Sequence, residues 1–379
     1  MYIKSVDFMN WRGFGSEGLS FSQPFAGKHV CQVHGENGSG KTAILEGILA
    51  CLFGALLING DVEFLGRKRP KNHRGVVLKE SYGAYIAKCR GLGNRVSSDN
   101  STSVSVTLGL ANGEADVAVR RQWFIDSDDV LVDVEAEIQS GSFNIKGRGV
   151  RSEQIHQIDN IIRERIFPPA IASILFGDDC WELSSDDGRR QLVERVDRSI
   201  SEIVRFQSSQ LLSRRKMQGG SAPADENAES DNLQVANLKR RLIQTWRNSF
   251  CSIMKNSRKN YFYDIYIDES FNVTAENGQS INGLLASGEW YILEVTLRTT
   301  IAREVRGLFP IAFEDPFGLL DQFNRDLLIR HFCVAESQLM LLFNEAQLSE
   351  RERHLLNACS AAISGLKYCD GGSRIVNEL

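Results

Sequence analysis

The sequence has no apolar stretch long enough to cross a membrane. Its longest apolar run, Gly47 to Ile58, falls well short of the roughly 18–20 residues that a membrane-spanning helix needs. The chain also does not open with a basic segment followed by an apolar one, which is the pattern of a secretory signal. From these absences we expect a cytoplasmic protein with no membrane partner.

The eight cysteines form neither a metal-binding nor a disulfide pattern. They lie at positions 31, 51, 89, 180, 251, 333, 359 and 369. None belongs to a C-x-x-C pair or to a cluster with histidine, so neither a zinc site nor a disulfide framework is expected. We expect reduced thiols, most of them buried.

A strong charge of either sign is also missing. The net charge of −4 gives no overall attraction to nucleic acid, so any contact with DNA must come from local basic groups. No internal repeat is evident. With 379 residues, of which 42% are hydrophobic, the chain can bury one large core or two ordinary ones, which excludes a disordered or collagen-like protein.

Residue patterns in the first half predict strands around a helix. Strands are expected from Tyr2 to Phe8 and from His29 to Val33, and an apolar helix from Ala43 to Phe53. Between residues 102 and 138 apolar and polar residues alternate, with Asn112-Gly113 as a two-residue turn. This alternation predicts an antiparallel arm of three or more strands.

Two expected helices divide the chain into an N-terminal lobe, residues 1–186, and a C-terminal lobe, residues 261–379. The helices are expected at 187–218 and 233–260, with a flexible linker that lacks large apolar residues at 219–232. The C-terminal lobe is expected to hold a helix after residue 288 and strands at 261–267, 271–274, 311–313 and 338–343. The predicted class is α/β, with both lobes forming one head.

A phosphate-binding pattern, G-x-x-x-x-G-K-[ST], occurs in the segment Gly35-Glu36-Asn37-Gly38-Ser39-Gly40-Lys41-Thr42. Its glycines let successive backbone N–H groups turn toward an anion at a helix N-terminus. Lys41 is expected to reach the β- and γ-phosphates of ATP, and Thr42 to bind Mg²⁺. All the residues of this P-loop are candidate nucleotide ligands.

Such a site also needs acidic residues on a neighbouring strand, and the chain offers Glu314-Asp315 after the apolar stretch Pro310 to Phe313. One carboxylate would hold Mg²⁺ and the other would orient the attacking water. We expect Glu314 to be the Mg²⁺ partner and Asp315 the base. Together with Lys41 they are the candidate catalytic residues.

Further segments complete a resemblance to the split ATPase head of SMC-type ABC ATPases. They are Ile3 to Phe14, Leu284-Leu285-Ala286-Ser287-Gly288-Glu289 and Gly318-Leu319-Leu320-Asp321. The resemblance implies a P-loop NTPase of ABC/SMC head type, in which the two helices form the stub of a coiled coil. It also implies ATP and Mg²⁺ as cofactors, and a head dimer. In this dimer each ATP lies between the P-loop of one copy and the signature segment, Leu284 to Glu289, of the other.

The same resemblance implies roles for residues outside the P-loop. Arg12 would contact nucleotide phosphate. Ser287 and Gly288, with Glu289 beside them, would face the partner's γ-phosphate, and Asp321 would lie at the dimer interface.

Within this superfamily the sequence is most similar to the DndD family, the ATPases of bacterial DNA sulfur modification (phosphorothioation). The segments that carry this likeness are Phe167-Pro168-Pro169 with Leu175 to Asp179, the stretch Gln338 to Glu345, and the tail Asp370 to Val376. The likeness implies action on double-stranded DNA with other sulfur-modification subunits, including a sulfurtransferase. No nucleophile for sulfur insertion is visible in the chain.

The sequence also departs from the superfamily pattern. The acidic pair is Glu-Asp where Asp-Glu is usual, Ala286 stands where the signature has a hydroxyl, and no histidine follows residue 343. Gly177-Asp178 takes the place of the Q-loop glutamine, and Asp178 is a candidate Mg²⁺ ligand with Thr42 and Glu314. These departures predict slow hydrolysis, or ATP binding with little turnover.

Contact with DNA is assigned to a basic run after the P-loop helix. Its candidate residues are Arg67, Lys68, Arg69, Lys71 and Arg74. Lys239-Arg240-Arg241 adds positive charge early in the second stub helix. Such runs can neutralise phosphates, and they also serve as solvated loops or as faces for protein partners.

The favoured function is an ATPase head that dimerises on ATP and acts on DNA in sulfur modification. Two alternatives stay open: an SMC-like ATPase of DNA repair or phage defence that works with a nuclease, and a weakly hydrolysing scaffold gated by ATP. A membrane transporter ATPase is disfavoured by the helical insert between the lobes and by Asn10-Trp11-Arg12, which resembles SMC-type proteins.

Overall fold

The computed structural model describes residues 1–21, 23–24, 28–54, 86–87, 89, 100–109, 115–126, 131–141, 143–149, 152–176, 183, 185–217, 227–255, 265–275, 278–281, 284–304, 309–318, 320–369 and 372–378. Several sequence predictions lie outside the described residues. They are the turn Asn112-Gly113, the Q-loop pair with Asp178, and the basic run with Arg67, Lys68, Arg69, Lys71 and Arg74.

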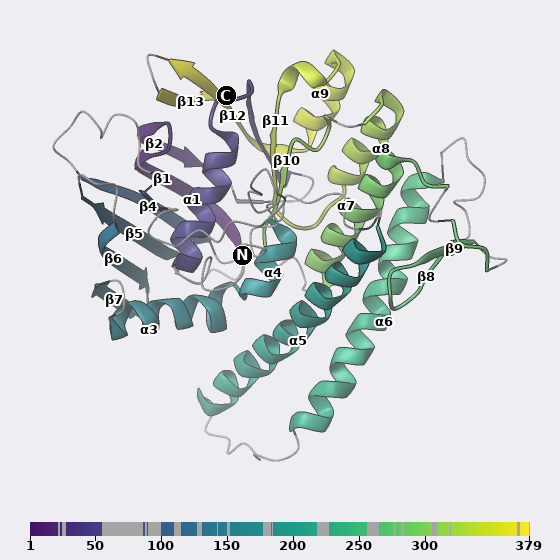
Figure 1. Cartoon of the computed structure of the whole chain (residues 1–379), viewed down its shortest axis with the longest axis horizontal. Helices are drawn as coiled ribbons and strands as arrows, with labels where there is room; N and C mark the ends of the chain where they lie inside the picture. The colour runs from purple at the N-terminus through teal and green to yellow at the C-terminus, as the bar shows by residue number, and fades with distance from the viewer. Residues whose placement is uncertain are drawn as a thin grey trace, which may run out of the picture.

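Within the described residues, one mixed sheet of eleven strands runs through the molecule (Figure 1). In spatial order its strands are β10 (Ile311–Glu314), β11 (Leu339–Phe343), β3 (Val30–Gly35), β12 (Ser360–Cys369), β13 (Gly372–Glu378), β2 (Phe14–Ser20), β1 (Tyr2–Trp11), β4 (Ser101–Gly109), β5 (Val117–Ile125), β6 (Leu131–Ser140) and β7 (Phe143–Arg148). The first four are parallel, whereas β1 and β4 to β7 pair antiparallel. The predicted antiparallel arm is confirmed, and it continues the sheet that carries the P-loop strand.

Helices flank this sheet on both sides of the parallel strands. They are α1 (Lys41–Phe53), α3 (Glu153–Ile161), α4 (Pro169–Leu175), α5 (Asp186–Met217), α6 (Asn227–Met254), α7 (Ser287–Glu304), α8 (Gln322–Phe332) and α9 (Glu350–Ala358). Two short helical turns, η4 (Ile162–Ile166) and η7 (Glu345–Gln347), and a small hairpin of β8 (Ile265–Ile267) and β9 (Val273–Ala275) complete the described elements. In Figure 1, α3 lies with the antiparallel arm, while α6, α7 and α8 gather on the opposite side of the parallel strands.

Helix α1 lies at the centre of the core. All its residues except Thr42 are buried, because its sequence is almost entirely apolar and it packs against elements on several sides. It contacts β1, β4 and β5 in the arm and β3, β10 and β11 in the parallel part of the sheet. The helix that begins at the P-loop is therefore held by both halves of the chain.

The two halves of the chain share the sheet itself. Strand β3 comes from the first half and lies between β11 and β12 from the second half. Near the start of β11, the buried side chain of Gln338 accepts a hydrogen bond from the Ile3 N–H at 2.8 Å and donates one to the Ile3 carbonyl at 2.9 Å. Both polar ends of this amide are satisfied, so it joins β1 to the parallel strands without leaving a buried polar group unpaired.

Helices α5 and α6 form the stub and project together from the head (Figure 1). Lys239 on α6 forms an ion pair with Asp197 on α5 at 2.7 Å. The predicted linker at 219–232 is wrong over its last six residues, because α6 begins at Asn227. Residues 227–232 contain neither glycine nor proline, so the helix continues through this polar segment. The second helix also ends at Met254, not at residue 260; residues 256–260 lie outside the described part.

The hairpin of β8 and β9 corrects a strand boundary. The expected strand at 271–274 begins at Val273, because Phe271 adopts a left-handed φ of 61°. Its N–H donates to the Asp268 carbonyl at 3.0 Å and closes the turn before the strand. Of the expected strand at 261–267, the described part is Ile265–Ile267.

The structure bears on membrane spans, metal clusters and thiols within the described residues. Among them, no helix combines the length and apolar character required to span a membrane. No group of three or more histidine, cysteine or acidic residues in the described part of the chain is placed to hold a metal ion. Free thiols are present at Cys31, Cys51, Cys89, Cys251, Cys333 and Cys359.

Candidate functional site

The P-loop connects β3 to α1 through two glycines in left-handed backbone conformations. Gly38 has a φ of 85° and Gly40 a φ of 104°, values that residues with side chains rarely adopt. A Cβ at Gly40 would lie 3.0 Å from both the Phe14 ring and Ser373 Oγ. Glycine is required there for the turn and for the space. As the N-cap, Gly40 supplies no side-chain acceptor, which leaves the first N–H groups of α1 for an anion.

Lys41 is buried, with its ammonium group turned toward the loop backbone. Nζ donates hydrogen bonds to the carbonyls of Gly35 at 2.7 Å and Glu36 at 2.8 Å. Burial lowers the pKa of Lys41, and the nearby carboxylates of Asp315 and Glu314 oppose that shift. Because an ammonium has three N–H donors, one is left for a phosphate oxygen.

Thr42 and Glu314 meet across the sheet edge. The Thr42 hydroxyl donates a hydrogen bond to Oε1 of Glu314, the last residue of β10. The parallel pairing of β10 with β11, and of β11 with β3, brings the C-terminal ends of these strands to one edge. A hydroxyl and a carboxylate in contact are a suitable oxygen pair for Mg²⁺.

Asp315 follows β10 in an unusual backbone conformation. Its φ is 51°, in the left-handed region that non-glycine residues rarely adopt, and its N–H donates to the Leu342 carbonyl at 2.7 Å. Gly318 lies against its side chain, since a Cβ there would come within 2.5 Å of Asp315 Oδ2. The absence of a side chain at Gly318 therefore leaves room for the Asp315 carboxylate.

A cavity of about 590 Å³ joins these groups. It is lined by Arg12, Asn37, Gly38, Gly40, Lys41, Thr42, Ala43, Glu46, Glu314 and Asp315. Its volume lies in the range of about 300–1,000 Å³ that is common for small-molecule sites. The P-loop and the acidic pair, which are more than 270 positions apart in the sequence, thus face one cavity.

Arg12 reaches this cavity from the turn between β1 and β2. It has a φ of 53°, and its N–H donates to the Cys89 carbonyl at 2.6 Å. Its guanidinium forms an ion pair with Glu46 at 3.0 Å. Glu46 is buried on α1, one turn after Thr42. Glu46 was not among the predicted site residues, although its position four residues after Thr42 places it on the helix face that meets the cavity.

Trp11 was also not among the predicted site residues. It is fully buried, and its indole Nε1 donates to the Ala43 carbonyl in the first turn of α1 at 2.8 Å. One turn further along α1, a Cβ at Gly47 would come within 2.6 Å of the Phe8 ring. Strand β1 therefore packs directly on the start of α1 and fixes its position.

The signature segment lies at the start of α7. The Ala286 N–H donates to Oε2 of Glu289 at 2.7 Å, so this buried carboxylate caps the helix. Ser287 is exposed. A Cβ at Gly288 would lie 3.1 Å from Nδ2 of Asn324, which places the start of α7 against the start of α8.

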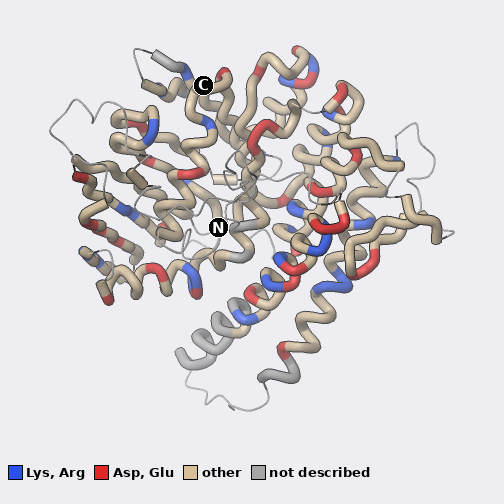
Figure 2. The backbone as a smooth tube through the Cα atoms, viewed as in Figure 1, with Lys and Arg blue, Asp and Glu red and all other residues tan. Residues whose placement is uncertain are grey.

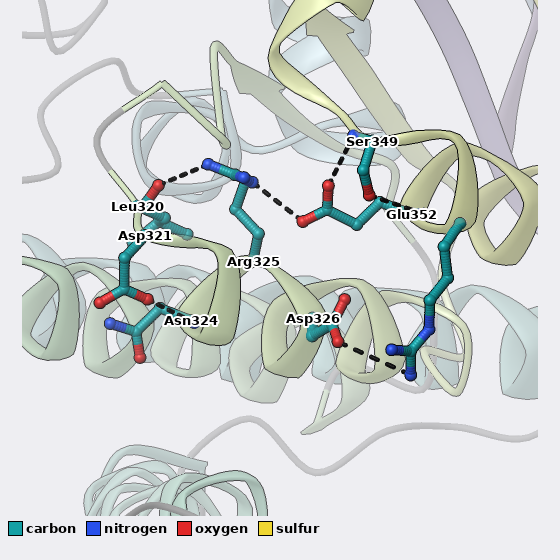
Figure 3. Close-up of polar contacts among 8 residues, drawn as sticks. Leu320, Asp321, Asn324, Arg325, Asp326, Ser349 and Glu352 are labelled. Carbon is teal, nitrogen blue, oxygen red and sulfur yellow. Dashed lines mark hydrogen bonds and ion pairs between the residues drawn. The ribbon is translucent and has the colours of Figure 1, made fainter.

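Asp321 is the N-cap of α8, and its carboxylate accepts a hydrogen bond from the Asn324 N–H at 2.8 Å (Figure 3). One turn later, Arg325 donates to the Leu320 carbonyl at 2.8 Å and to the carboxylate of Glu352 at 3.0 Å. Glu352 lies on α9 and is fully buried. The loop before α8 is therefore anchored to α9 by a charge-assisted contact.

The predicted site residues fall into three groups. Arg12, the acidic pair and five P-loop residues line one cavity; the five are Asn37, Gly38, Gly40, Lys41 and Thr42. Gly35, Glu36 and Ser39 of the P-loop are not among its described lining residues. Ser287, Gly288, Glu289 and Asp321 are not among the described residues that line the P-loop cavity. Asp178 lies outside the described residues, as does the basic run 67–74.

The residues at the cavity fit ATP with Mg²⁺. Gly38 and Gly40, whose backbones are left-handed, line the cavity beside Lys41 and leave its wall free of bulky side chains. Lys41 and the N-terminus of α1 offer positive groups to phosphates, and Thr42 and Glu314 offer oxygens to a divalent cation.

Comparisons with known proteins give a family and a fold. A sequence profile described as an AAA domain matches residues 5–248, which is more than half of the chain. No curated protein matches the chain.

Two solved structures of SMC heads resemble the whole chain. An SMC head bound to the C-winged helix domain of ScpA has a TM-score of 0.57 at 14% sequence identity, and the match covers 100% of this chain and 98% of that one. An SMC head with an extended coiled coil, bound to the C-terminal domain of ScpA derived from Pyrococcus furiosus, has a TM-score of 0.50 at 14% identity, with coverage of 100% and 96%. The predicted α/β fold, a P-loop head of ABC/SMC type, is confirmed by this likeness.

Proposed function

The chain belongs to the AAA domain family and has the fold of an SMC-type ATPase head, and we propose that it binds ATP with Mg²⁺ and hydrolyses it slowly. One observation carries the proposal: Lys41, Thr42, Glu314 and Asp315 line a single cavity. These are the side chains that hold phosphate, metal and water in P-loop ATPases.

The roles follow from the contacts. ATP with Mg²⁺ would supply a γ-phosphoryl group whose transfer to water these residues promote. Lys41 and the N–H groups at the start of α1 would hold the phosphates, while Thr42 and Glu314 would hold the cation. Asp315 would orient the attacking water, and Arg12, held by Glu46, would contact a phosphate.

Slow hydrolysis follows from the position of the base. Asp315 is one methylene shorter than the glutamate that usually stands there, and its backbone has the left-handed φ of 51°. Its carboxylate occupies the space that a side chain at residue 318 would fill. A short side chain on a constrained backbone reaches water over a narrow range of positions, which reduces turnover without affecting how phosphate is held.

The separation of the signature from the P-loop supports a shared site between two copies. Ser287 is exposed at the start of α7, and this end of α7 lies against the start of α8, where Asp321 is the N-cap. Neither is among the described residues that line their own chain's cavity. We infer that Ser287 and Gly288 act on ATP held by a second copy, and that Glu289 supports them by capping the start of α7. If ATP binds to the dimer and not to the separate copies, it stabilises the association of the two copies.

The resemblance to the DndD family supports a role on double-stranded DNA in phosphorothioation, with a sulfurtransferase among the partner subunits. The proposed DNA contacts are Arg67, Lys68, Arg69, Lys71 and Arg74. The basic residues Lys239-Arg240-Arg241 on α6 support this role less. Lys239 is paired with Asp197, and Arg241 with Glu304. Along α5 and α6 both signs of charge are present (Figure 2).

A second candidate, an ATP-gated scaffold with little turnover, is favoured by the signature itself. Ala286 lacks the hydroxyl that would meet phosphate, and its N–H is occupied by the Glu289 carboxylate. A scaffold of this kind would dimerise on ATP and hardly hydrolyse it.

The rate of phosphate release, measured against protein concentration with and without duplex DNA, tests these proposals. A specific rate that rises with protein concentration supports the shared site, and a further rise with DNA supports the role on DNA. A low rate in the presence of ATP-dependent dimers supports the scaffold. Absence of both turnover and nucleotide binding, in a preparation with the expected circular dichroism spectrum, would contradict the proposed function.

A further inference from the structure

A second cavity lies away from the P-loop, among helices α6, α7 and α8. It has a volume of about 420 Å³ and also touches Ile311, the first residue of β10. It shares no lining residue with the P-loop cavity. A cavity of this size accommodates a small organic molecule.

Two arginines give this cavity its charge. Arg303 on α7 and Arg330 on α8 both line it and are both exposed. Neither guanidinium has an ion-pair partner among the described residues. Glu336 is the acidic residue of the lining, so the charges at the cavity sum to about +1 when His331 is neutral. Arginine recognises phosphate and carboxylate groups with paired N–H donors.

Hydroxyl groups from α6 and α7 also line this cavity. Thr300 is buried, and its hydroxyl has no hydrogen-bond partner among the described residues. Ser249 and Ser252 on α6 line the same cavity. A buried hydroxyl without a partner is unfavourable, so this wall offers an unused hydrogen-bonding group to a polar ligand or to water.

His331 adds a neutral polar group to this wall. Burial, and to a smaller degree the charge of Arg303, lowers the pKa of His331 to about 4. Its Nε2 lies 2.8 Å from the Thr299 hydroxyl. At neutral pH the imidazole is therefore uncharged, and the two guanidinium groups are the cationic groups that a ligand meets.

Apolar side chains form the remaining wall. Ile253, Ile311 and Leu327 line it together with the arginines and hydroxyls. An inorganic anion would leave this apolar surface uncovered, whereas a phosphate ester with a carbon skeleton would cover it.

We propose that this cavity binds a small phosphate monoester, with its phosphoryl group between Arg303 and Arg330 and its carbon skeleton against the apolar wall. The phosphate could belong to a free metabolite or to the 5′ end of a nucleic acid strand. Such a ligand would bridge the C-terminal ends of α7 and α8, whose N-terminal ends carry Ser287 and follow Asp321.

Isothermal titration calorimetry with phenyl phosphate tests the proposal. The Lys41→Ala variant serves as the background, because it removes the main phosphate ligand of the P-loop. In it we expect saturable binding that the added pair Arg303→Gln and Arg330→Gln weakens at least tenfold. The matched control pair, Arg163→Gln and Arg165→Gln, alters two exposed arginines on η4 and is expected to leave the affinity unchanged.

A 5′-phosphorylated dinucleotide distinguishes the two sources. Tighter binding of this dinucleotide than of phenyl phosphate, lost without the 5′ phosphate, assigns the site to a nucleic acid end, and the reverse order assigns it to a metabolite. The proposal is overturned if the Lys41→Ala protein, with an unchanged circular dichroism spectrum, shows no saturable binding of either probe. Equal weakening by the control pair also overturns it. Neither result bears on ATP binding at the P-loop.

Discussion

The hydroxyl of Thr42 donates a hydrogen bond to the carboxylate of Glu314, and this contact joins the first turn of α1 to the end of β10. It links two segments that are 272 residues apart in the chain. Lys41 and Asp315, their immediate neighbours, line the same cavity. The contact therefore marks where the phosphate-binding and acidic motifs form one site.

Lys41→Ala is expected to weaken ATP binding by about 10- to 100-fold, because a charge-assisted hydrogen bond contributes about 1.5–3 kcal/mol. Titration with a fluorescent ATP analogue measures the affinity. The control is Lys4→Ala, which removes an exposed lysine that pairs with Asp116 at the surface. An affinity for ATP that is the same in both variants would contradict the placement of Lys41 at the phosphates.

Asp315→Asn is expected to lower kcat by about 10²–10⁴-fold and to preserve ATP affinity, since it removes a base but no phosphate ligand. Glu314→Gln should instead raise the Mg²⁺ concentration needed for half-maximal binding of ATP. Steady-state phosphate release across a Mg²⁺ series separates the two effects. Equal rates for the wild type and Asp315→Asn would show that Asp315 does not orient water.

Gly318→Ala tests whether the space beside Asp315 matters. The added methyl group would displace the Asp315 carboxylate, because its Cβ would lie 2.5 Å from Oδ2. We expect a lower kcat with an unchanged KM for ATP. Gly15→Ala is a matched control, since a Cβ at Gly15 has no neighbour within 4 Å. The same kcat in the two variants would show that catalysis does not depend on the space that Gly318 leaves for the Asp315 carboxylate.

The sequence predicts the parts of this site that are local. Gly35 to Thr42 is contiguous, and each of its residue types has a reason that does not depend on the rest of the fold. Glu314-Asp315 is predictable because an apolar strand leads into it. Both segments are found where the sequence analysis expects them, at the ends of β3 and β10.

Other features depend on contacts between distant residues, and sequence patterns do not reveal them. The pairing of Glu46 with Arg12 joins residues on α1 and on the turn before β2. The space at Gly318 is visible only when the Asp315 side chain has been placed. The start of α6 at Asn227 was missed because Asn, Ala, Glu and Ser suit a linker as well as a helix, so composition alone does not place this boundary.

Arg121→Met is expected to destabilise the protein by about 3–5 kcal/mol, because it breaks a buried ion pair with Asp159 and leaves a buried carboxylate. Arg121 also donates to the Cys51 carbonyl near the end of α1 at 2.7 Å. Urea denaturation measures the free energy of unfolding. The double variant Arg121→Met/Asp159→Leu should recover part of the loss. Arg148→Met, which removes an exposed pair with Asp133, should cost much less; an equal cost would contradict the account.

The stability of the protein should fall as the pH drops from 6.5 toward 4. Burial lowers the pKa of His331 to about 4 in the folded protein, while the unfolded chain keeps a value near 6.5. As the pH falls from 6.5 to 4, His331 therefore binds a proton more readily in the unfolded state than in the folded state. This difference lowers the free energy of unfolding by at most about 3 kcal/mol. Urea denaturation at pH 7 and pH 4 should show a smaller difference in His331→Gln than in the wild type. The same pH dependence in both proteins would show that His331 does not cause the loss of stability at low pH.

Complementation between two inactive variants tests the shared site most directly. Lys41→Ala removes the phosphate ligand of one copy, and Ser287→Arg blocks the exposed signature that we assign to the other copy. Each variant alone should release phosphate at the background rate. In an equal mixture about half of the dimers contain both variants, and each of these has one intact site, so the account predicts about a quarter of the wild-type rate. A mixture that stays at the background rate, although both variants dimerise with ATP-bound wild type, would contradict it.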